Sequence, residues 1–351
     1  MKIISYFLAI LVITGSIFYY GCDDSGFIPT PLPTGQIYLN QSNLKPLIQD
    51  VDGWYQLWIA LDTLNTREWY SAGAFNISYS GAIVDLNGAP MTFNFNGDTN
   101  RLNLSAHALI TIEKQVVFTP GALRLISGSL SVNSDSAFGQ LKMSGSEAFG
   151  NMGLVLIGDD NNCPVTAPNN CAIGSYILQS PTTSNADCLK GLWFATTSGN
   201  STFPDGLDIP GSLGWTYEAW VVQNSTQIFH SLGRFNGFNQ ADSDGPGSCP
   251  GSNPVDPFNS VPGQEYAAGC LNGENLNNGD FGVFITIEPN NESGTSLSSP
   301  FPIKLFLRSV IQSSLNCGVN DVYFRPLSRD CLEPFAFLKI EFFENSHEKH
   351  E

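Results

Sequence analysis

The chain contains an internal repeat, and this repeat constrains its fold more than any other feature of the sequence. Residues 53–60 (GWYQLWIA) match residues 214–222 (GWTYEAWVV), with one residue inserted after the first Trp. Three further blocks follow in the same order in both copies: residues 71–76 match 231–236, residues 110–113 match 285–288, and an apolar run begins at Pro120 and at Pro300. Four matching blocks in one order indicate two copies of one module.

Each block has the pattern of a β-strand. Side chains at odd and even positions of residues 55–60 fall on opposite faces, with the period of two that a strand requires. Both faces are largely apolar, which favours a central strand, and Trp58 and Trp220 share one strand position, which favours a role in the core. Segments rich in Gly, Asn and Ser separate the blocks. We therefore predict an all-β fold with two tandem Ig-like β-sandwich modules.

The mature chain of roughly 320 residues has room for about two domains. We expect a signal peptide, a Pro-rich tether, two modules, the second with a long Cys-containing insertion at about 239–280, a C-terminal disulfide and strand segment, and a polar tail. Their predicted bounds are 1–21 for the signal peptide, 22–35 for the tether, 36–135 and 136–313 for the modules, 314–344 for the C-terminal segment and 345–351 for the tail.

The N-terminus indicates export. Lys2 precedes an apolar run from Ile3 to Tyr20, which is the layout of a secretory signal peptide. Gly21 and Cys22 follow, and this exit resembles a lipobox, at which the lipidated Cys becomes the first residue. We expect a lipoprotein anchored through Cys22 in the outer membrane or at the cell surface. A periplasmic signal-anchor is the alternative, because about 18 apolar residues can just span a bilayer.

The repeated motifs carry a family resemblance. Their order, Tyr-x-x-Trp, then Gly-x-Phe, then Ile-Thr-Ile-Glu with Pro following, resembles the extracytoplasmic domain of anti-sigma-K factors. Glu288-Pro289 keeps the final pair of that family, whereas Glu113-Lys114 does not. The resemblance implies anti-sigma-K-like β-sandwich modules. Only Met1-Lys2 precedes the apolar run, so we expect a role in binding, sensing or envelope structure and no direct control of a sigma factor.

Charge limits the partners. The net charge is −17 and only 13% of the residues are charged. This composition argues against nucleic acid, which is bound through clustered Lys and Arg. We expect the membrane as a partner through the N-terminal lipid, together with an unidentified envelope protein or glycan.

The cysteines predict disulfides in an oxidising compartment. Local pairing gives three bonds, and Cys188 is then left over, so a different pairing that uses Cys188 stays open. The three local pairs are Cys163–Cys171, Cys249–Cys270 and Cys317–Cys331.

No catalytic motif occurs in the sequence. His230 aligns with Tyr70 of the first copy, which favours strand packing over general-base chemistry. Glu113 and Glu288 hold equivalent places, and we interpret them as strand-end carboxylates that accept backbone N–H groups. We therefore predict a protein without enzymatic activity.

Two weaker binding features remain. Asp242 and Asp244 begin a motif like that of a calcium loop, although Pro246 follows where more oxygen ligands are needed, so an Asx-rich turn is the simpler interpretation. Calcium is the one cofactor we expect as a possibility. Trp69 lies beside Arg67 in what reads as a polar turn, and it is our candidate for ligand contact. A carbohydrate-binding or glycan-degrading surface lipoprotein is accordingly the alternative function.

Overall fold

The computed structural model is built from antiparallel β-sheets. It describes residues 34–62, 67–102, 106–143, 146–148, 175–183, 185–195, 214–237, 239–252, 261–290 and 334–343, with short pieces at 299–302, 308–311, 313, 316–318 and 322–323. The strands pair only in antiparallel fashion and no α-helix occurs in this part of the chain, so the all-β prediction is confirmed. Cys22 and the predicted signal peptide lie outside the described residues.

One sheet has ten strands in the order β4-β3-β2-β6-β7-β9-β18-β1-β5, with β8 paired to β9. The sheet curls until β5 contacts β3, where the Tyr70 ring packs edge-on against Phe95 at 5.2 Å. Its strands are β1 (Gly35–Ser42), β2 (Trp54–Asp62), β3 (Arg67–Ile77), β4 (Ile83–Val84), β5 (Phe93–Phe95), β6 (His107–Glu113), β7 (Arg124–Ser129), β8 (Ser131–Val132), β9 (Ser136–Lys142) and β18 (Phe335–Phe342).

The remaining strands form two four-stranded sheets, in the orders β14-β11-β10-β17 and β13-β12-β15-β16. Their bounds are β10 (Ser175–Leu178), β11 (Gly191–Trp193), β12 (Trp215–Gln223), β13 (Ile228–Phe235), β14 (Gly263–Glu265), β15 (Phe281–Pro289), β16 (Arg308–Val310) and β17 (Val322–Tyr323). Short 3₁₀ helices are η1 (Thr99–Arg101), η2 (Asn185–Lys190), η4 (Cys270–Gly273) and η5 (Leu276–Asn278). None of the described helices is long and apolar enough to cross a membrane.

The two copies of the repeat share one strand order. The order β3-β2-β6-β7 corresponds to β13-β12-β15-β16, and β9-β18-β1-β5 corresponds to β17-β10-β11-β14. Each strand holds the same place along the chain as its counterpart, with one exception. The exception is the strand beside β11 in the second copy and beside β1 in the first. In the second copy this strand is β10, which directly precedes β11 in the chain, whereas in the first copy it is β18, from the end of the described chain.

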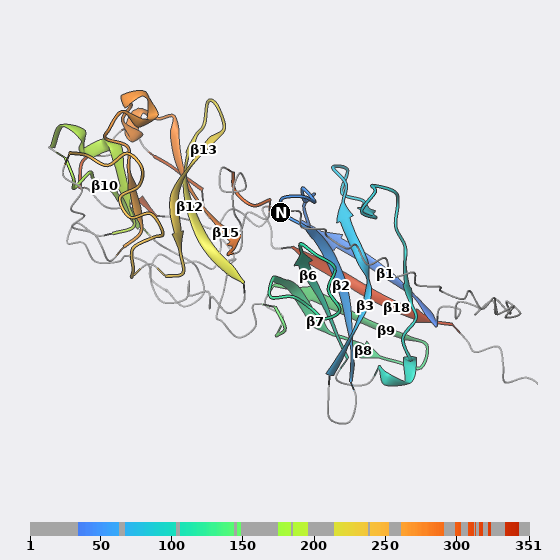
Figure 1. Cartoon of the computed structure of the whole chain (residues 1–351). Coiled ribbons are helices and arrows are strands. Elements are labelled where there is room, and N and C mark those ends of the chain that lie inside the picture. Colours follow the sequence, from blue (N-terminus) through green and yellow to red (C-terminus); the bar gives the residue numbers. More distant parts are fainter. Residues whose placement is uncertain are drawn as a thin grey trace, which may run out of the picture. The chain divides into compact units, whose positions relative to one another are not determined.

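β18 lies between β1 and β9 (Figure 1), with β1 paired along Gly35–Ser42 and β9 along Ser136–Lys142. Its inward side chains Ala336, Leu338 and Ile340 are buried in the core. β9 thus belongs to the ten-stranded sheet, although our sequence-based boundary assigned residues 136–142 to the second module. The boundary was placed by the repeat blocks, and these carry no information on which distant strand completes a sheet.

A buried hydrogen-bond chain recurs in both copies. In the first, Trp58 Nε1 donates to Thr111 Oγ1 at 2.9 Å, and Thr111 Oγ1 donates to Glu113 Oε1 at 2.6 Å. Gly121 N also donates to Glu113 Oε1, at 2.9 Å. Both carboxylate contacts come from groups near in sequence, as expected of a strand-end residue.

In the second copy Trp220 Nε1 donates to Thr286 Oγ1 at 2.9 Å, and Thr286 Oγ1 donates to Glu288. Phe301 N completes the chain by donating to Glu288 Oε1 at 2.9 Å. The backbone repeats as well, because Gly53 and Gly214 precede the strand with φ of 93° and 74°, a region that favours glycine. The hydrogen-bond chain and the glycine conformation therefore recur at equivalent positions of the two sequence blocks.

Removal of β18 tests how far the ten-stranded sheet depends on it. A chain ending at residue 333 leaves β1 and β9 with unpaired backbone groups and removes three buried aliphatic side chains from the core, so we expect loss of the cooperative thermal transition of this sheet. Circular dichroism melting measures it. The control is a chain ending at residue 343, which keeps β18 and should melt like the full chain. Equal melting of both truncations would contradict the role of β18.

The repeated hydrogen-bond chain is tested at its central residue. Thr286→Val leaves Trp220 Nε1 without its acceptor and Glu288 without one donor, so we expect the free energy of unfolding to fall by about 1–3 kcal/mol. Urea unfolding followed by Trp fluorescence measures it. The control Thr226→Val alters an exposed hydroxyl in the β12–β13 turn. A change within about 0.5 kcal/mol for Thr286→Val, typical of a surface site, would show that the chain is not a stabilising element.

Candidate functional site

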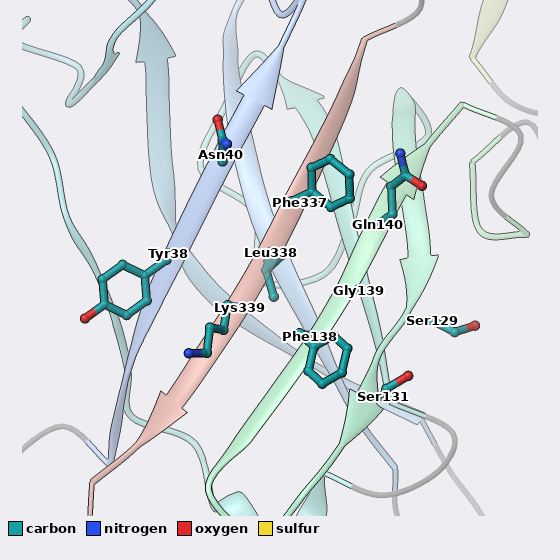
Figure 2. A pocket seen from close by; sticks show the side chains of 10 residues that line it. All are labelled: Tyr38, Asn40, Ser129, Ser131, Phe138, Gly139, Gln140, Phe337, Leu338 and Lys339. Carbon is teal, nitrogen blue, oxygen red and sulfur yellow. The ribbon is translucent and has the colours of Figure 1, made fainter.

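A groove of about 600 Å³ lies on the outer face of the ten-stranded sheet, over β1, β18, β9 and β8 (Figure 2). Three aromatic side chains line it: Tyr38, Phe138 and Phe337 are 46%, 45% and 52% exposed. Large apolar side chains are normally inside a protein, so three half-exposed rings in one groove mark this face as a candidate binding surface.

The strand pattern explains why the rings face outward. Along β18, Ala336, Leu338 and Ile340 point into the core, so Phe337 and Lys339 between them must point out. The same alternation on β1 turns Tyr38 and Asn40 outward. The groove is therefore a consequence of strand periodicity on adjacent strands.

The register arranges the groove residues in two rows across the sheet. One row runs Asn40–Phe337–Gln140, so an amide flanks the Phe337 ring on each side. The other runs from Tyr38 through Lys339 to Phe138, next to Ser131 on β8. Figure 2 shows rings and polar groups alternating over this face.

The charge in the groove is locally paired. Lys339 Nζ donates to Glu341 Oε1 at 2.6 Å on the same strand. The amides of Asn40 and Gln140 are neutral donors and acceptors. The face thus offers aromatic rings and uncharged hydrogen-bonding groups, and it carries no strong net charge.

Ser129 lies at the edge of the groove, and its Oγ is 3.1 Å from His107 Nε2. The two residues are direct cross-strand partners on β6 and β7. This pairing explains their contact without requiring nucleophilic chemistry.

Trp69 differs from the sequence interpretation. We expected an exposed ring in a polar turn, but Trp69 lies within β3 and is half-buried, with the Arg67 guanidinium 5.9 Å from its ring. Arg67 and Glu68 before it are exposed at the start of β3. A short sequence window does not distinguish such an exposed strand end from a polar turn. Its role in ligand contact stays a prediction.

His230 lies opposite Val221, as Tyr70 lies opposite Ile59 in the first copy. Its ring packs against Tyr266 at 6.2 Å, and burial lowers its pKa. Strand packing was the interpretation we favoured, and this geometry agrees with it. Glu113 and Glu288, the other paired candidates, accept backbone N–H groups as described above.

Asp242 and Asp244 form the Asx-type turn that was the simpler interpretation, because Asp244 N donates to Asp242 Oδ1 at 3.1 Å. Gly263 N donates to Asp242 Oδ2 at 2.7 Å. Burial raises the pKa of Asp242 to about 8, with the Asp244 charge adding to the rise, and burial also raises the pKa of Asp244. In the described part of the chain, no group of three His, Cys, Asp or Glu side chains is arranged to hold a metal.

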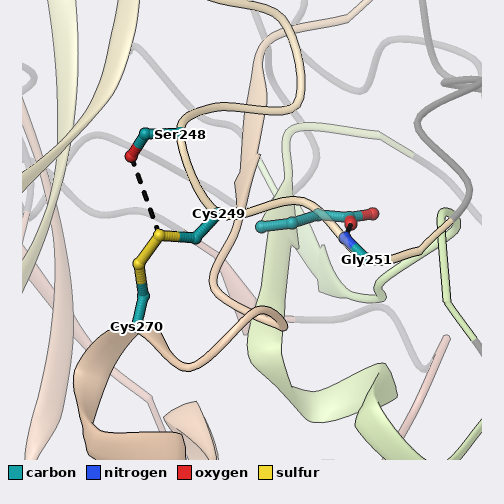
Figure 3. The surroundings of a disulfide bond; sticks show 5 residues. Ser248, Cys249, Gly251 and Cys270 are labelled. Atoms are coloured by element: carbon teal, nitrogen blue, oxygen red, sulfur yellow. Dashed lines mark hydrogen bonds between the residues drawn. A yellow bond between two sulfur atoms is a disulfide. The ribbon is translucent and has the colours of Figure 1, made fainter.

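One predicted disulfide pairing is confirmed, and another is wrong. Cys249 and Cys270 are bonded as predicted (Figure 3), with Cα atoms 6.1 Å apart. Cys317 is bonded to Cys188 and not to Cys331, with Cα atoms 5.7 Å apart. The two residues are 129 positions apart, and only the fold brings them together. Cys163, Cys171 and Cys331 lie outside the described residues.

Sequence reasoning missed the groove residues. Tyr38, Phe138 and Phe337 come from three distant segments, and nothing in the sequence places those strands side by side. The alternation of Phe337 with buried aliphatic residues was the available signal. It predicts that Phe337 faces outward, but it does not predict which strands lie beside β18.

Comparison of the chain with protein-family models, with curated proteins and with solved structures finds no match. The candidate site is therefore interpreted from its own geometry.

Proposed function

We propose that this chain is an exported, lipid-anchored binding protein without enzymatic activity, and that the groove over β1, β18 and β9 binds a glycan chain. The observation that carries the proposal is the pair of rows in which Tyr38, Phe138 and Phe337 alternate with the amides of Asn40 and Gln140, the Lys339 ammonium and the Ser131 hydroxyl. The choice between a protein and a glycan as ligand follows from the chemistry of these rows.

A sugar ring presents apolar C–H faces and a rim of hydroxyl groups. Exposed aromatic rings pack on the faces, and neutral amides such as Asn40 and Gln140 both donate to and accept from the hydroxyls. Neighbouring strands lie about 4.8 Å apart, so rings on β1 and β9, two strands from each other, are separated by roughly 10 Å. This separation lets the two rings contact different units of one glycan chain.

A protein partner fits this face less well. The core of a protein interface is a desolvated patch with few charged groups. Here Lys339 lies between Tyr38 and Phe138, and amides lie on both sides of Phe337. No two of the three rings are direct neighbours across the sheet, so the apolar surface is divided into separate platforms.

The two copies are best interpreted as β-sandwich modules of the type found in the extracytoplasmic domain of anti-sigma-K factors. The shared strand order and the recurring Trp–Thr–Glu chain support a common module. The glutamate of the Ile-Thr-Ile-Glu motif, which carries the resemblance, has a structural role in both copies. We infer binding or sensing at the envelope and no contact with a sigma factor.

Glycan binding is tested by removing the rings. Phe337→Ala takes away the central ring, and we expect the dissociation constant for a bound polysaccharide to rise about tenfold or more, which corresponds to about 1.4 kcal/mol. Affinity electrophoresis against a panel of envelope and plant polysaccharides finds the ligand, and calorimetry measures the change.

The control for this experiment is Phe118→Ala, which removes an exposed ring that does not line the groove. Trp69→Ala tests the ring suspected from the sequence. Binding that survives Phe337→Ala and is lost in Trp69→Ala would move the site to β3. Absence of binding across the whole panel, with a protein captured instead, would reject the glycan proposal.

The anchor is tested separately. Cys22→Ser removes the thiol that would carry the lipid, so we expect the protein to leave the membrane fraction and to lose incorporation of labelled fatty acid. Cys249→Ser is the control, since it removes a cysteine whose sulfur is held in a disulfide and does not carry the lipid. A Cys22→Ser protein that stays in the membrane fraction would favour the signal-anchor over the lipoprotein.

A further inference from the structure

The turn at residues 242–247 is held against β14 by backbone hydrogen bonds. Glu265 N donates to Pro246 O at 3.0 Å, and Ala268 N donates to Cys249 O at 3.2 Å. The Cys249–Cys270 disulfide closes the same segment (Figure 3). The turn and β14 therefore form one fixed arrangement, to which Asp242 adds its bond from Gly263 N.

The carboxylates of Asp242 and Asp244 converge within this arrangement. Both point their Oδ1 atoms at the space above Gly233, where a methyl group would collide with each of them. Gly233 has a φ of 88°, so glycine suits this position for its backbone as well as for the space. Two oxygens from the turn thus lie close together over β13.

Two more oxygens lie against the turn without hydrogen-bond partners. Gln264 Oε1 and Tyr266 Oη are buried and unpartnered among the described residues, and each residue is only 4% exposed. The Gln264 carboxamide lies against Gly247 of the turn. Burial raises the pKa of the Tyr266 phenol, and the charges of Asp244 and Asp242 add to this rise. A buried polar atom without a partner is costly, so these two oxygens indicate a missing ligand.

A positively charged side chain also lies near the pair. Arg234 follows Gly233 on β13, and its Nε donates to Glu218 Oε2 at 2.8 Å. Two carboxylates this close to each other repel unless a proton or a cation joins them.

We propose that Asp242 and Asp244, together with Gln264 Oε1 and Tyr266 Oη, form a binding site for a calcium ion. All four donors are oxygens, which suit a hard cation, and calcium accepts irregular sets of carboxylate, amide and neutral oxygens. With only two carboxylates, the site belongs to the weak class of extracellular modules, which bind at about 10⁻⁴–10⁻³ M. The ion would tie the turn to β14 and to the adjoining Tyr266 in the second copy, and this inference does not depend on the groove.

Terbium luminescence and calcium titration test the site in the purified chain. Tb³⁺ takes the same oxygen ligands as calcium, and excitation of aromatic residues sensitises it only when it binds close to one. We expect a saturable Tb³⁺ signal, its displacement by Ca²⁺ at about millimolar concentration, and a rise in melting temperature with Ca²⁺. No Ca²⁺-dependent signal or melting shift up to 10-fold above this range, about 10 mM, would overturn the proposal.

Asp244→Asn removes one charge from the site, and we expect Ca²⁺ to bind about tenfold more weakly. Its matched control is Asp85→Asn, an exposed turn in the ten-stranded sheet where Asp85 Oδ1 accepts from Asn87 N at 2.9 Å. Unchanged Ca²⁺ affinity in Asp244→Asn would place the ion elsewhere.

A second variant keeps the test decisive if Asp244→Asn does not fold. Tyr266→Phe removes only the unpartnered hydroxyl, and we expect several-fold weaker Ca²⁺ binding with a weaker Tb³⁺ signal. A protein whose melting temperature rises with Asp244→Asn, while the parent shows no response to Ca²⁺, would show that the aspartates share a proton and hold no metal.

Discussion

The place of β18 between β1 and β9 is the constraint on which the ten-stranded sheet depends. Its inward residues complete the core, and its two edges satisfy the backbone groups of two other strands. Its outward residues, Phe337 and Lys339, form the middle of the groove. The groove therefore exists only when a strand near the end of the chain has joined strands from its beginning. Because this contact spans most of the sequence, we expect it to form late in folding.

Periodicity and duplication in the sequence were enough to predict the strands at the repeat blocks. They also gave the buried positions of Trp58 and Trp220 and the structural role of Glu113 and Glu288. They were not enough to show which strands are neighbours. The pairing of β18 with β1, the Cys188–Cys317 disulfide and the groove all depend on residues far apart in sequence, and local pattern holds no information on them. Trp69 shows the same limit in a short window, since a strand end and a polar turn have similar composition.

The two copies differ at the face that forms the groove. In the second copy β10 and β11 take the places of β18 and β1, and their outward residues are Ile177 and Trp193. Both are buried, and they pack with Ala195 and Val261 into a small second core. The segment leading into β14 thus covers the face that stays open in the first copy. Among the described residues, the aromatic face is thus open in the ten-stranded sheet and covered at the equivalent strands β10 and β11.

A second difference concerns charge inside the repeated strand. Gln56 of the first copy lies opposite Ala74, and the equivalent pair in the second copy is Glu218 opposite Arg234. The side chains of Gln56 and Glu218 both bond the serine at the same place, Ser71 or Ser231. Burial raises the pKa of Glu218, and the hydrogen bonds from Ser231 and Arg234 act against this rise. The buried Glu218 carboxylate of the second copy is thus paired with a cation, Arg234, on the neighbouring strand.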